Sequence, residues 1–396
     1  MTRVYITGSS ILLGGLVDVS EVWRAQLQGT PLQSKILTEE YSKEALGCSD
    51  EEFSVLSEHQ IMALLVAETA WKNAGLSINR KPLKGLSSSN IDQSFGCVSG
   101  TSLGGLMAMT SEISQNSWSP TPYSMSRWRG NAIGSVVSQR YGLGGCNLSI
   151  NAASATGAQA LFIAGSLIRA GIITSAVVVA ADATVQGCVN EAQEATGAVT
   201  KNDAPPLDRN RTGMRPVAGA ACVILESEER VIGRQAHPMA EWIGGVSVSE
   251  AYHSRAVDPD AKMLRYALDK LIAETCENGD PRVIDWVSLH ATGTRVFDLI
   301  EINAIKTCLR DHHPWLSAMK RVNGHSLSAS GLIDAVLVTH GLSHGEMPPW
   351  PSNTDPELDL DSVKPLTPHV PENAILIAQG MGGVICLNYL AKPKKN

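Results

Sequence analysis

The segment that decides the fold is residues 141–157, YGLGGCNLSINAASATG, which leads from a β-type stretch into an Ala-rich region. A strand is predicted at about 147–153 and a buried helix at 154–170, where Ala is interspersed with larger apolar residues. Ser154 therefore lies at a strand-to-helix turn, where the backbone N–H groups of a helix N-terminus favour a developing anion. A Ser in this position serves as a helix N-cap or as a nucleophile, and the pattern alone leaves both interpretations open.

Two later segments combine a predicted strand end, small residues and a histidine. Residues 288–294 read SLHATGT, with Asp298 and Glu301 in the helix that is expected to follow. Residues 320–326 read KRVNGHS and again precede small residues and a predicted helix. A single histidine at a strand end is usually structural, but two of them in such similar surroundings indicate one shared site.

Strands and helices alternate along the chain, which predicts a layered α/β architecture. The predicted strands lie at 4–7, 94–99, 147–153, 175–182, 219–226, 239–247, 283–289, 374–380 and 384–390. The predicted helices lie at 21–27, 60–73, 154–170, 260–274, 298–309 and 329–342. Residues 30–58 are interpreted as irregular, and the pair His312-His313 as a solvated loop. Because the second half repeats the rhythm of the first, two similar halves are expected, 1–230 with the nucleophile position and 231–396 with the two histidines.

Composition excludes several classes of protein. The 396 residues are 43% hydrophobic and 18% charged, as in a globular protein with a large core, and the net charge of −7 argues against general nucleic-acid binding. The eight Cys are scattered without a CxxC pair, which predicts reduced thiols, no disulfide and no metal site. The sequence begins without a signal-peptide pattern and has no apolar run that demands a membrane span, so a cytoplasmic protein without a membrane partner is expected.

Over nearly its whole length the chain resembles the β-ketoacyl-acyl-carrier-protein synthases, the ketosynthases of the thiolase-like fold. The motifs that carry the resemblance are the lead-in at 141–150, VSGTSLGGL at 98–106, the central segment 206–226, HATGT at 290–294 and NGHSLSASG at 323–331. The resemblance implies a five-layered α/β/α/β/α sandwich made of two similar halves.

The resemblance also implies a set of catalytic positions. In that family a Cys at a helix N-terminus accepts an acyl chain from a carrier protein, and two histidines bind the thioester carbonyl of the malonyl unit. Ser154 stands at the nucleophile position, His290 and His325 match the two histidines, and Lys320 matches the family's lysine. No metal or bound cofactor is implied, only the phosphopantetheine of an acyl carrier protein as the substrate carrier.

Substrate-binding positions follow from the same resemblance. Thr292 and Thr294 match threonines that hold the pantetheine arm. Met381 and Gly382 lie in the segment that corresponds to the family's gating loop, where Gly-Phe-Gly-Gly becomes Gly-Met-Gly-Gly at 380–383.

The chain departs from the family at several positions. A Ser at position 154 is far less acidic than a Cys and needs a general base within hydrogen-bonding reach. The central segment has Val-Ala-Gly at 217–219 in place of Gly-Glu-Gly, and 384–385 is Val-Ile in place of Thr-Asn. Residues 57–62 read SEHQIM and follow three acidic residues at 50–52, where active members often carry basic residues that dock the acidic carrier protein.

Three hypotheses are compatible with these departures. The first is a chain-length-factor-like subunit that pairs with a Cys-bearing ketosynthase and shapes the tunnel for a fatty-acid-like, polyketide or polyene chain. The second is an active condensing enzyme that uses Ser154, and the third is a condensing enzyme whose natural Cys was replaced by Ser. Typical chain-length factors lack both histidines, which speaks against the first; the missing docking charges and gating Phe speak against the third. We adopt the first, with a heterodimer expected and a homodimer as the alternative.

Aromatic residues mark a predicted interface. Proteins of this fold dimerise through the strand before the nucleophile, here 147–151, with residues near 105–135 reaching toward the partner's tunnel. Trp118, Tyr123 and Trp128 lie in that region although only 5% of the chain is aromatic. They are interpreted either as ordinary packing or as residues that limit the length of the partner's acyl tunnel.

Overall fold

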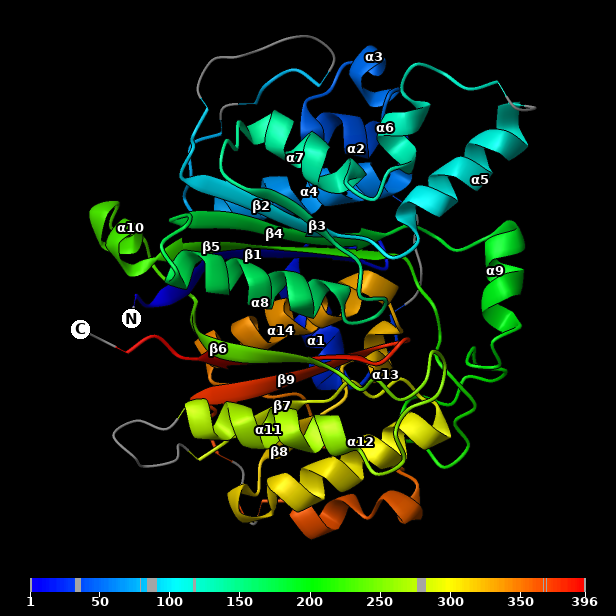
Figure 1. Ribbon diagram of the computed structural model, residues 1–396, viewed down its shortest axis with the longest axis vertical. Helices are drawn as coiled ribbons and strands as arrows, with labels where there is room; N and C mark the ends of the chain where they lie inside the picture. The colour runs from blue at the N-terminus through cyan, green and yellow to red at the C-terminus, as the bar shows by residue number, and fades with distance from the viewer. Residues whose placement is uncertain are drawn as a thin grey trace.

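The molecule consists of alternating layers of helices and β-sheet (Figure 1). The computed structural model describes residues 2–32, 37–78, 80–83, 91–116, 119–275, 283–365, 367 and 369–394. One outer layer contains α2–α7, the central layer contains α1, α8 and α14, and the other outer layer contains α11 and α12. A group of strands separates each pair of neighbouring helical layers, which gives the predicted α/β/α/β/α order.

The strands of the described ranges are β1 (Val4–Leu13), β2 (Phe95–Gly100), β3 (Asn147–Ile150), β4 (Ser175–Asp182), β5 (Gly219–Ser227), β6 (Ala240–Ser249), β7 (Trp286–Ser288), β8 (Trp315–Ser317), β9 (Asn373–Gly380) and β10 (Val384–Ala391). The helices before residue 200 are α1 (Val19–Gln28), α2 (Glu39–Leu46), α3 (Asp50–Phe53), α4 (Glu58–Asn73), α5 (Gly104–Asn116), α6 (Ser124–Trp128), α7 (Ala132–Tyr141), α8 (Thr156–Arg169) and α9 (Gly187–Glu194). The later helices are α10 (Glu228–Gly233), α11 (Lys262–Glu274), α12 (Arg295–Cys308), α13 (Lys320–Asn323) and α14 (Ser330–His344).

The strands follow the order β3-β2-β4-β5-β1-β6-β10-β9-β7-β8. β1 is antiparallel to β5 along most of its length, but it pairs with β6 only through Val4, Tyr5 and Ile6. The short junction joins two groups of five strands that lie in different layers (Figure 1).

Helices α8 and α14 form the centre of the molecule. Every residue of α14 from Ser330 to Leu342 is buried, as expected for a helix that is covered on all sides. The two helices approach closely because each has a small residue at the contact. A Cβ added to Gly157 would lie 2.8 Å from Leu332 Cβ, and one added to Gly331 would lie 2.8 Å from Ala158 Cβ. The strand-to-helix turn at Ser154 therefore begins a helix whose position is tightly constrained.

Several predictions about individual elements are wrong. The segment 30–58 contains two helices, and their ends explain why a polar sequence folds. Thr38 accepts a hydrogen bond from an N–H of α2, and Ser49 and Glu52 form a capping box at α3. His312 is not in a solvated loop: it ends a 3₁₀ turn, and its Nδ1 accepts a hydrogen bond from the N–H of Ile284 at 3.1 Å.

Two further observations concern the described part of the chain. No helix there is long and apolar enough to span a membrane. All of the cysteines there are free thiols.

Candidate active site

The turn between β3 and α8 presents Ser154. β3 ends at Ile150, three residues earlier than predicted, and Ala153 adopts a left-handed conformation with φ of +48°. Thr156 holds this turn: its Oγ1 accepts a hydrogen bond from the N–H of Ala152 at 2.8 Å and donates one to the carbonyl oxygen of Ala153 at 2.7 Å. Ser154 is not the helix N-cap, because that position belongs to Ala155.

Glycines allow neighbouring strands to reach the Ser154 turn. A Cβ on Gly380, the last residue of β9, would lie 2.1 Å from the carbonyl oxygen of Ala152. A Cβ on Gly100, the last residue of β2, would lie 2.2 Å from Thr156 Cγ2. Only glycine can occupy either position without displacing the turn.

One pocket, with a volume of about 340 Å³, contains most of the predicted site. Residues that are far apart in the sequence line it, including Ser154, His290, Thr292, Thr294, His325, Gln379 and Met381. Thr292 Oγ1 and Thr294 Oγ1 lie 3.0 Å apart, so the two hydroxyls share a hydrogen bond. Gly382 lies next to this pocket in the β9–β10 turn, where its φ of +96° requires glycine.

His325 is a hydrogen-bond donor that points into a buried space. Its Nδ1 accepts a hydrogen bond from the N–H of Leu327 at 3.0 Å, so the ring proton is on Nε2. That Nε2 atom is buried and has no hydrogen-bond partner within the described ranges. Burial lowers the pKa of His325 to about 3, and the nearby charge of Lys320 acts in the same direction. The ring is therefore neutral at pH 7.

His290 follows β7, and Glu301 holds its backbone in place. The N–H groups of His290 and Ala291 donate hydrogen bonds to the two carboxylate oxygens of Glu301 at 2.6 and 2.8 Å. Its ring centroid is 5.9 Å from that of His325, and the ring planes are nearly perpendicular at 85°. Burial lowers the pKa of His290 well below its usual range, with Lys320 as the next cause.

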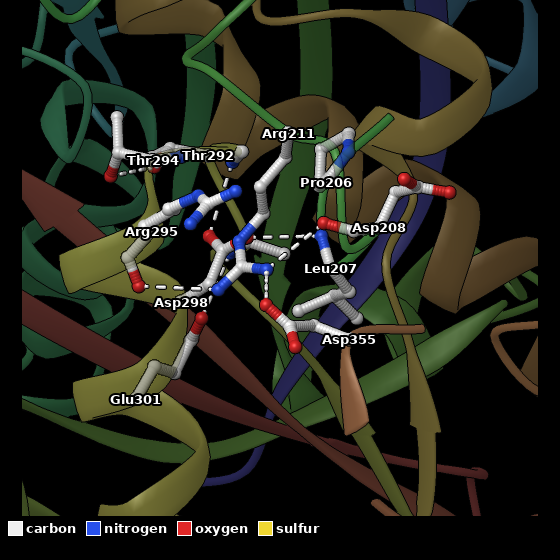
Figure 2. A network of polar contacts seen from close by, with 12 residues as sticks. Pro206, Leu207, Asp208, Arg211, Thr292, Thr294, Arg295, Asp298, Glu301 and Asp355 are labelled. Carbon is white, nitrogen blue, oxygen red and sulfur yellow. Dashed lines mark hydrogen bonds and ion pairs between the residues drawn. The ribbon is translucent and has the colours of Figure 1, made fainter. Parts of the chain in front are cut away.

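A buried network of charges holds the loop that carries His290 and the two threonines (Figure 2). Asp298 accepts hydrogen bonds from the N–H of Gly293 at 3.1 Å and of Leu207 at 3.0 Å. Arg211 bridges two carboxylates, with its Nε 3.0 Å from Asp298 and its Nη1 2.8 Å from Asp355. The network thus ties the central segment to the loop after β7.

Burial also changes the acidity of the carboxylates in this network. It raises the pKa of Asp298 to about 6 and that of Glu301 to about 7. Hydrogen bonds from backbone N–H groups oppose the shift in both cases, because they stabilise the ionised form. Near neutral pH, Glu301 therefore binds a proton for a large fraction of the time.

Lys320 lies beside the Ser154 pocket and forms an ion pair. Its Nζ forms a buried ion pair with Asp334 at 2.9 Å, and burial raises the pKa of that carboxyl. Lys320 does not line the Ser154 pocket but a neighbouring pocket that shares His325 and Thr292 with it. It acts on the histidines through its charge.

Tyr123 and Trp128 of the predicted interface do not line the Ser154 pocket. Trp128 is the last residue of α6, and its Nε1 donates a hydrogen bond to Glu112 at 3.0 Å. Tyr123 precedes α6 and is half-buried. Trp118 lies outside the described residues.

Sequence reasoning missed one residue that supports the site. Asp182, the last residue of β4, is fully buried and accepts hydrogen bonds from Thr101 Oγ1 at 2.7 Å and Ser102 Oγ at 2.6 Å. It also accepts bonds from the N–H groups of Leu103 and Ser328, both at 2.9 Å. Asp182 therefore joins the loop after β2 to the segment after His325. The available signal was an acidic residue at the end of a strand that is otherwise Val, Ala and Ser.

Comparisons with known proteins identify the family. The model of the β-ketoacyl synthase N-terminal domain matches residues 1–230, and that of the C-terminal domain matches residues 240–354. The chain belongs to the β-ketoacyl synthase family. The resemblance inferred from the sequence motifs is therefore confirmed, and so is the thiolase-like fold.

Two relatives illustrate the similarity to other β-ketoacyl synthases. The 3-oxoacyl-(acyl-carrier-protein) synthase 2 of Mycobacterium bovis is 28% identical over 319 residues, which are 77% of this chain and 73% of that protein. The tetracenomycin polyketide synthase ketoacyl synthase alpha subunit of Streptomyces glaucescens is 27% identical over 433 residues, 99% of this chain and 98% of that protein.

Solved structures of ketosynthases have the same fold. One match is a chain from the structure of a type II polyketide synthase acyl-carrier protein in complex with its ketosynthase bound to the hexaketide. Its TM-score is 0.82, and it is 24% identical over 99% of this chain and 100% of the other. The ishigamide ketosynthase/chain length factor matches with a TM-score of 0.82 and 21% identity over the same shares. A β-ketoacyl synthase from Burkholderia phymatum matches with a TM-score of 0.83 and 20% identity over both whole chains.

Proposed function

We propose that this chain is a ketosynthase-like subunit that acts in the elongation of a fatty-acid-like, polyketide or polyene chain on an acyl carrier protein. Within that role, we propose that it is the chain-length-factor partner of a Cys-bearing ketosynthase and does not condense acyl units by itself. The proposed complex is a heterodimer, and the phosphopantetheine arm of the carrier protein brings the substrate.

The observation that carries the proposal is the lack of a base for Ser154. An alkyl hydroxyl becomes a nucleophile only when a neighbouring group removes its proton. His325 has its proton on Nε2, because its Nδ1 accepts the Leu327 N–H, so the atom that faces the buried space is a donor. No hydrogen bond joins Ser154 Oγ to His290 or to any other residue that the structure describes. These contacts support a site that binds a carbonyl but does not activate its hydroxyl.

Two surface features support a partner subunit. β3 is the edge strand of its sheet, and its first three residues, Asn147–Ser149, are exposed, including the apolar side chain of Leu148. Sheet edges of this kind are usually covered by another element or chain. The acidic residues at 50–52 lie on α3 and Glu58 begins α4, so this face would repel an acidic carrier protein, which would then dock on the partner.

The second candidate function is a condensing enzyme that requires Cys at position 154. The observation that favours it is the intact support of the histidines. Glu301 orients the backbone of His290, and Asp182 and Lys320 constrain the segment around His325. A chain that only lined a partner's tunnel would not need this support.

The test compares the purified chain with its Ser154→Cys variant, using acyl and malonyl units on an acyl carrier protein. The proposal expects no condensation product from the natural chain alone, and product when the chain is combined with a Cys-bearing ketosynthase. Condensation by the unmodified chain without a partner would refute the proposal.

Activity of the Ser154→Cys variant alone would support the second candidate function instead. The matched control adds His325→Gln to Ser154→Cys, because this variant keeps the thiol and removes the Nε2 donor. Activity that survives in the double variant would not come from the pocket described above. Recovery of an untagged ketosynthase with an affinity-tagged form of this chain distinguishes a heterodimer from a homodimer.

A further inference from the structure

A second pocket lies beside the candidate active site. It has a volume of about 210 Å³ and shares His325 and Thr292 with the Ser154 pocket, whereas Ser154 lines only the first. We call it the arginine pocket, and its polar lining includes Gln26, Asn202, Arg215, Lys320 and Arg321. Trp350 and several prolines supply apolar walls. The proposed function does not use the charge of this pocket.

Two guanidinium groups in the arginine pocket form no ion pair with a described residue, although Asp208 and Asp298 act on Arg321 from a greater distance. Arg215 is half-buried, and its Nη2 donates a hydrogen bond to the carbonyl oxygen of Val322 at 3.1 Å. Arg321 is also half-buried and donates to the carbonyl oxygens of Pro206 at 2.5 Å and Ser352 at 2.8 Å. Neither arginine forms an ion pair with any residue of the described ranges. Carbonyl oxygens carry only a partial negative charge, so these hydrogen bonds do not balance the positive charge of either guanidinium, which is also partly desolvated.

The remaining charges of the lining leave the arginine pocket positive. Lys320 forms a buried ion pair with Asp334, so the two add no net charge. Asp203 is the acidic residue in the lining; it is exposed and forms no ion pair with a described residue. Among the lining side chains, two arginines without an ion pair and one exposed carboxylate give a net charge of about +1, and Asp208 and Asp298 outside the lining reduce the field at Arg321.

We propose that the arginine pocket binds a small anion with a carboxylate group. A guanidinium presents two parallel N–H donors that match the two oxygens of a carboxylate, and such charge-assisted pairs are the strong ones. The volume of about 210 Å³ leaves room for an anion the size of bicarbonate or malonate together with ordered water.

The arginine pocket is also directly connected to His325. The N–H of His325 donates a hydrogen bond to the carbonyl oxygen of Arg215 at 2.8 Å, and the N–H of Val217 donates to the carbonyl oxygen of His325 at 3.0 Å. An anion bound by Arg215 would therefore stabilise the segment that positions His325. This inference does not rest on the proposed function, because anion binding is measured without any condensation activity.

The test measures binding of sodium malonate, bicarbonate and acetate by calorimetry and by the shift of the unfolding temperature, with sodium chloride at equal ionic strength as reference. We expect saturable binding of at least one carboxylate. Arg215→Gln and Arg321→Gln should each raise its Kd at least about tenfold, because a charged hydrogen bond is lost. Arg265→Gln is the matched control: Arg265 is a half-buried arginine of α11 outside the pocket and should leave the Kd unchanged.

The outcomes separate anion binding from a structural role. If the arginines only hold neighbouring loops together through hydrogen bonds, both variants will lose thermal stability and carboxylates will bind no better than chloride. That result would overturn the inference. Equal Kd values in the natural chain and both variants would overturn it too. If Arg215→Gln does not fold, Arg215→Lys keeps the charge without the paired donors and should still weaken binding. Competition by malonyl-pantetheine, but not by acetyl-pantetheine, would identify a substrate carboxylate, and competition by neither would identify a free anion.

Discussion

Replacing Glu301 by Gln should change how the stability of the protein depends on pH. The pKa of this carboxyl is 4.5 in an unfolded chain and about 7 in the folded protein, where burial disfavours its charged form. A folded pKa that is raised means that the stabilising contribution is present below pH 4.5 and is lost as the pH rises through about 7. At about 1.4 kcal/mol for each pH unit, the difference corresponds to about 3 kcal/mol.

The assay is thermal unfolding of the natural chain and Glu301→Gln between pH 4.5 and 8 at constant ionic strength. Gln cannot ionise, so its cost in stability should not depend on pH. The unfolding temperature of the natural chain should therefore fall relative to the variant by about 4 °C over this range, using about 2.1 cal/mol/K of unfolding entropy per residue. Glu274→Gln, a substitution at an exposed position of α11, is the control and should leave the pH profile unchanged.

Parallel pH profiles for the natural chain and Glu301→Gln would refute the reasoning. Such a result would mean that the two N–H donors from His290 and Ala291 keep Glu301 ionised throughout. Backbone hydrogen bonding would then outweigh burial at this site.

Three further substitutions test the local geometry. Gly380→Ala should destabilise the protein by about 1–3 kcal/mol, because its Cβ would lie 2.1 Å from a carbonyl oxygen of the Ser154 turn; Gly233→Ala, with open space around the new Cβ, is the control in thermal unfolding. Asp182→Asn should cost about 1–3 kcal/mol in the same assay, since at least one buried donor would face an amide N–H group. Trp128→Ala should lengthen the product of the proposed heterodimer as measured by mass spectrometry; unchanged lengths in an intact complex would reject a chain-length role.

The elements that the sequence predicts best are those that are buried on all sides. The strand expected at 175–182 has the observed bounds, because the apolar run SAVVVAAD has no other stable location than a covered sheet. The helices of the outer layer were harder to predict. α2 and α3 are polar and short, and they form because capping residues satisfy their free N–H groups, a signal that a hydrophobic pattern does not contain.

The sequence also predicts one part of the candidate site and not another. Small-residue motifs around Ser154, His290 and His325 predicted three segments that the fold brings to one pocket. The direction in which His325 donates, however, depends on a single N–H from Leu327, and the sequence does not reveal that contact. Likewise, Lys320 pairs with Asp334, fourteen residues later, only because α13 and α14 pack at that register.

The short junction between β1 and β6 has a consequence for synthesis on the ribosome. Val4, Tyr5 and Ile6 are synthesised more than 230 residues before Ala240–Trp242, the segment of β6 with which they pair. At roughly 5–20 residues per second, this side of the nascent strand has no native partner for roughly 10–50 seconds. During that interval an open strand edge is exposed to other nascent chains. Newly made protein should therefore depend on chaperones more than the stability of the finished molecule suggests, and slowing translation between residues 13 and 240 should lower the soluble yield.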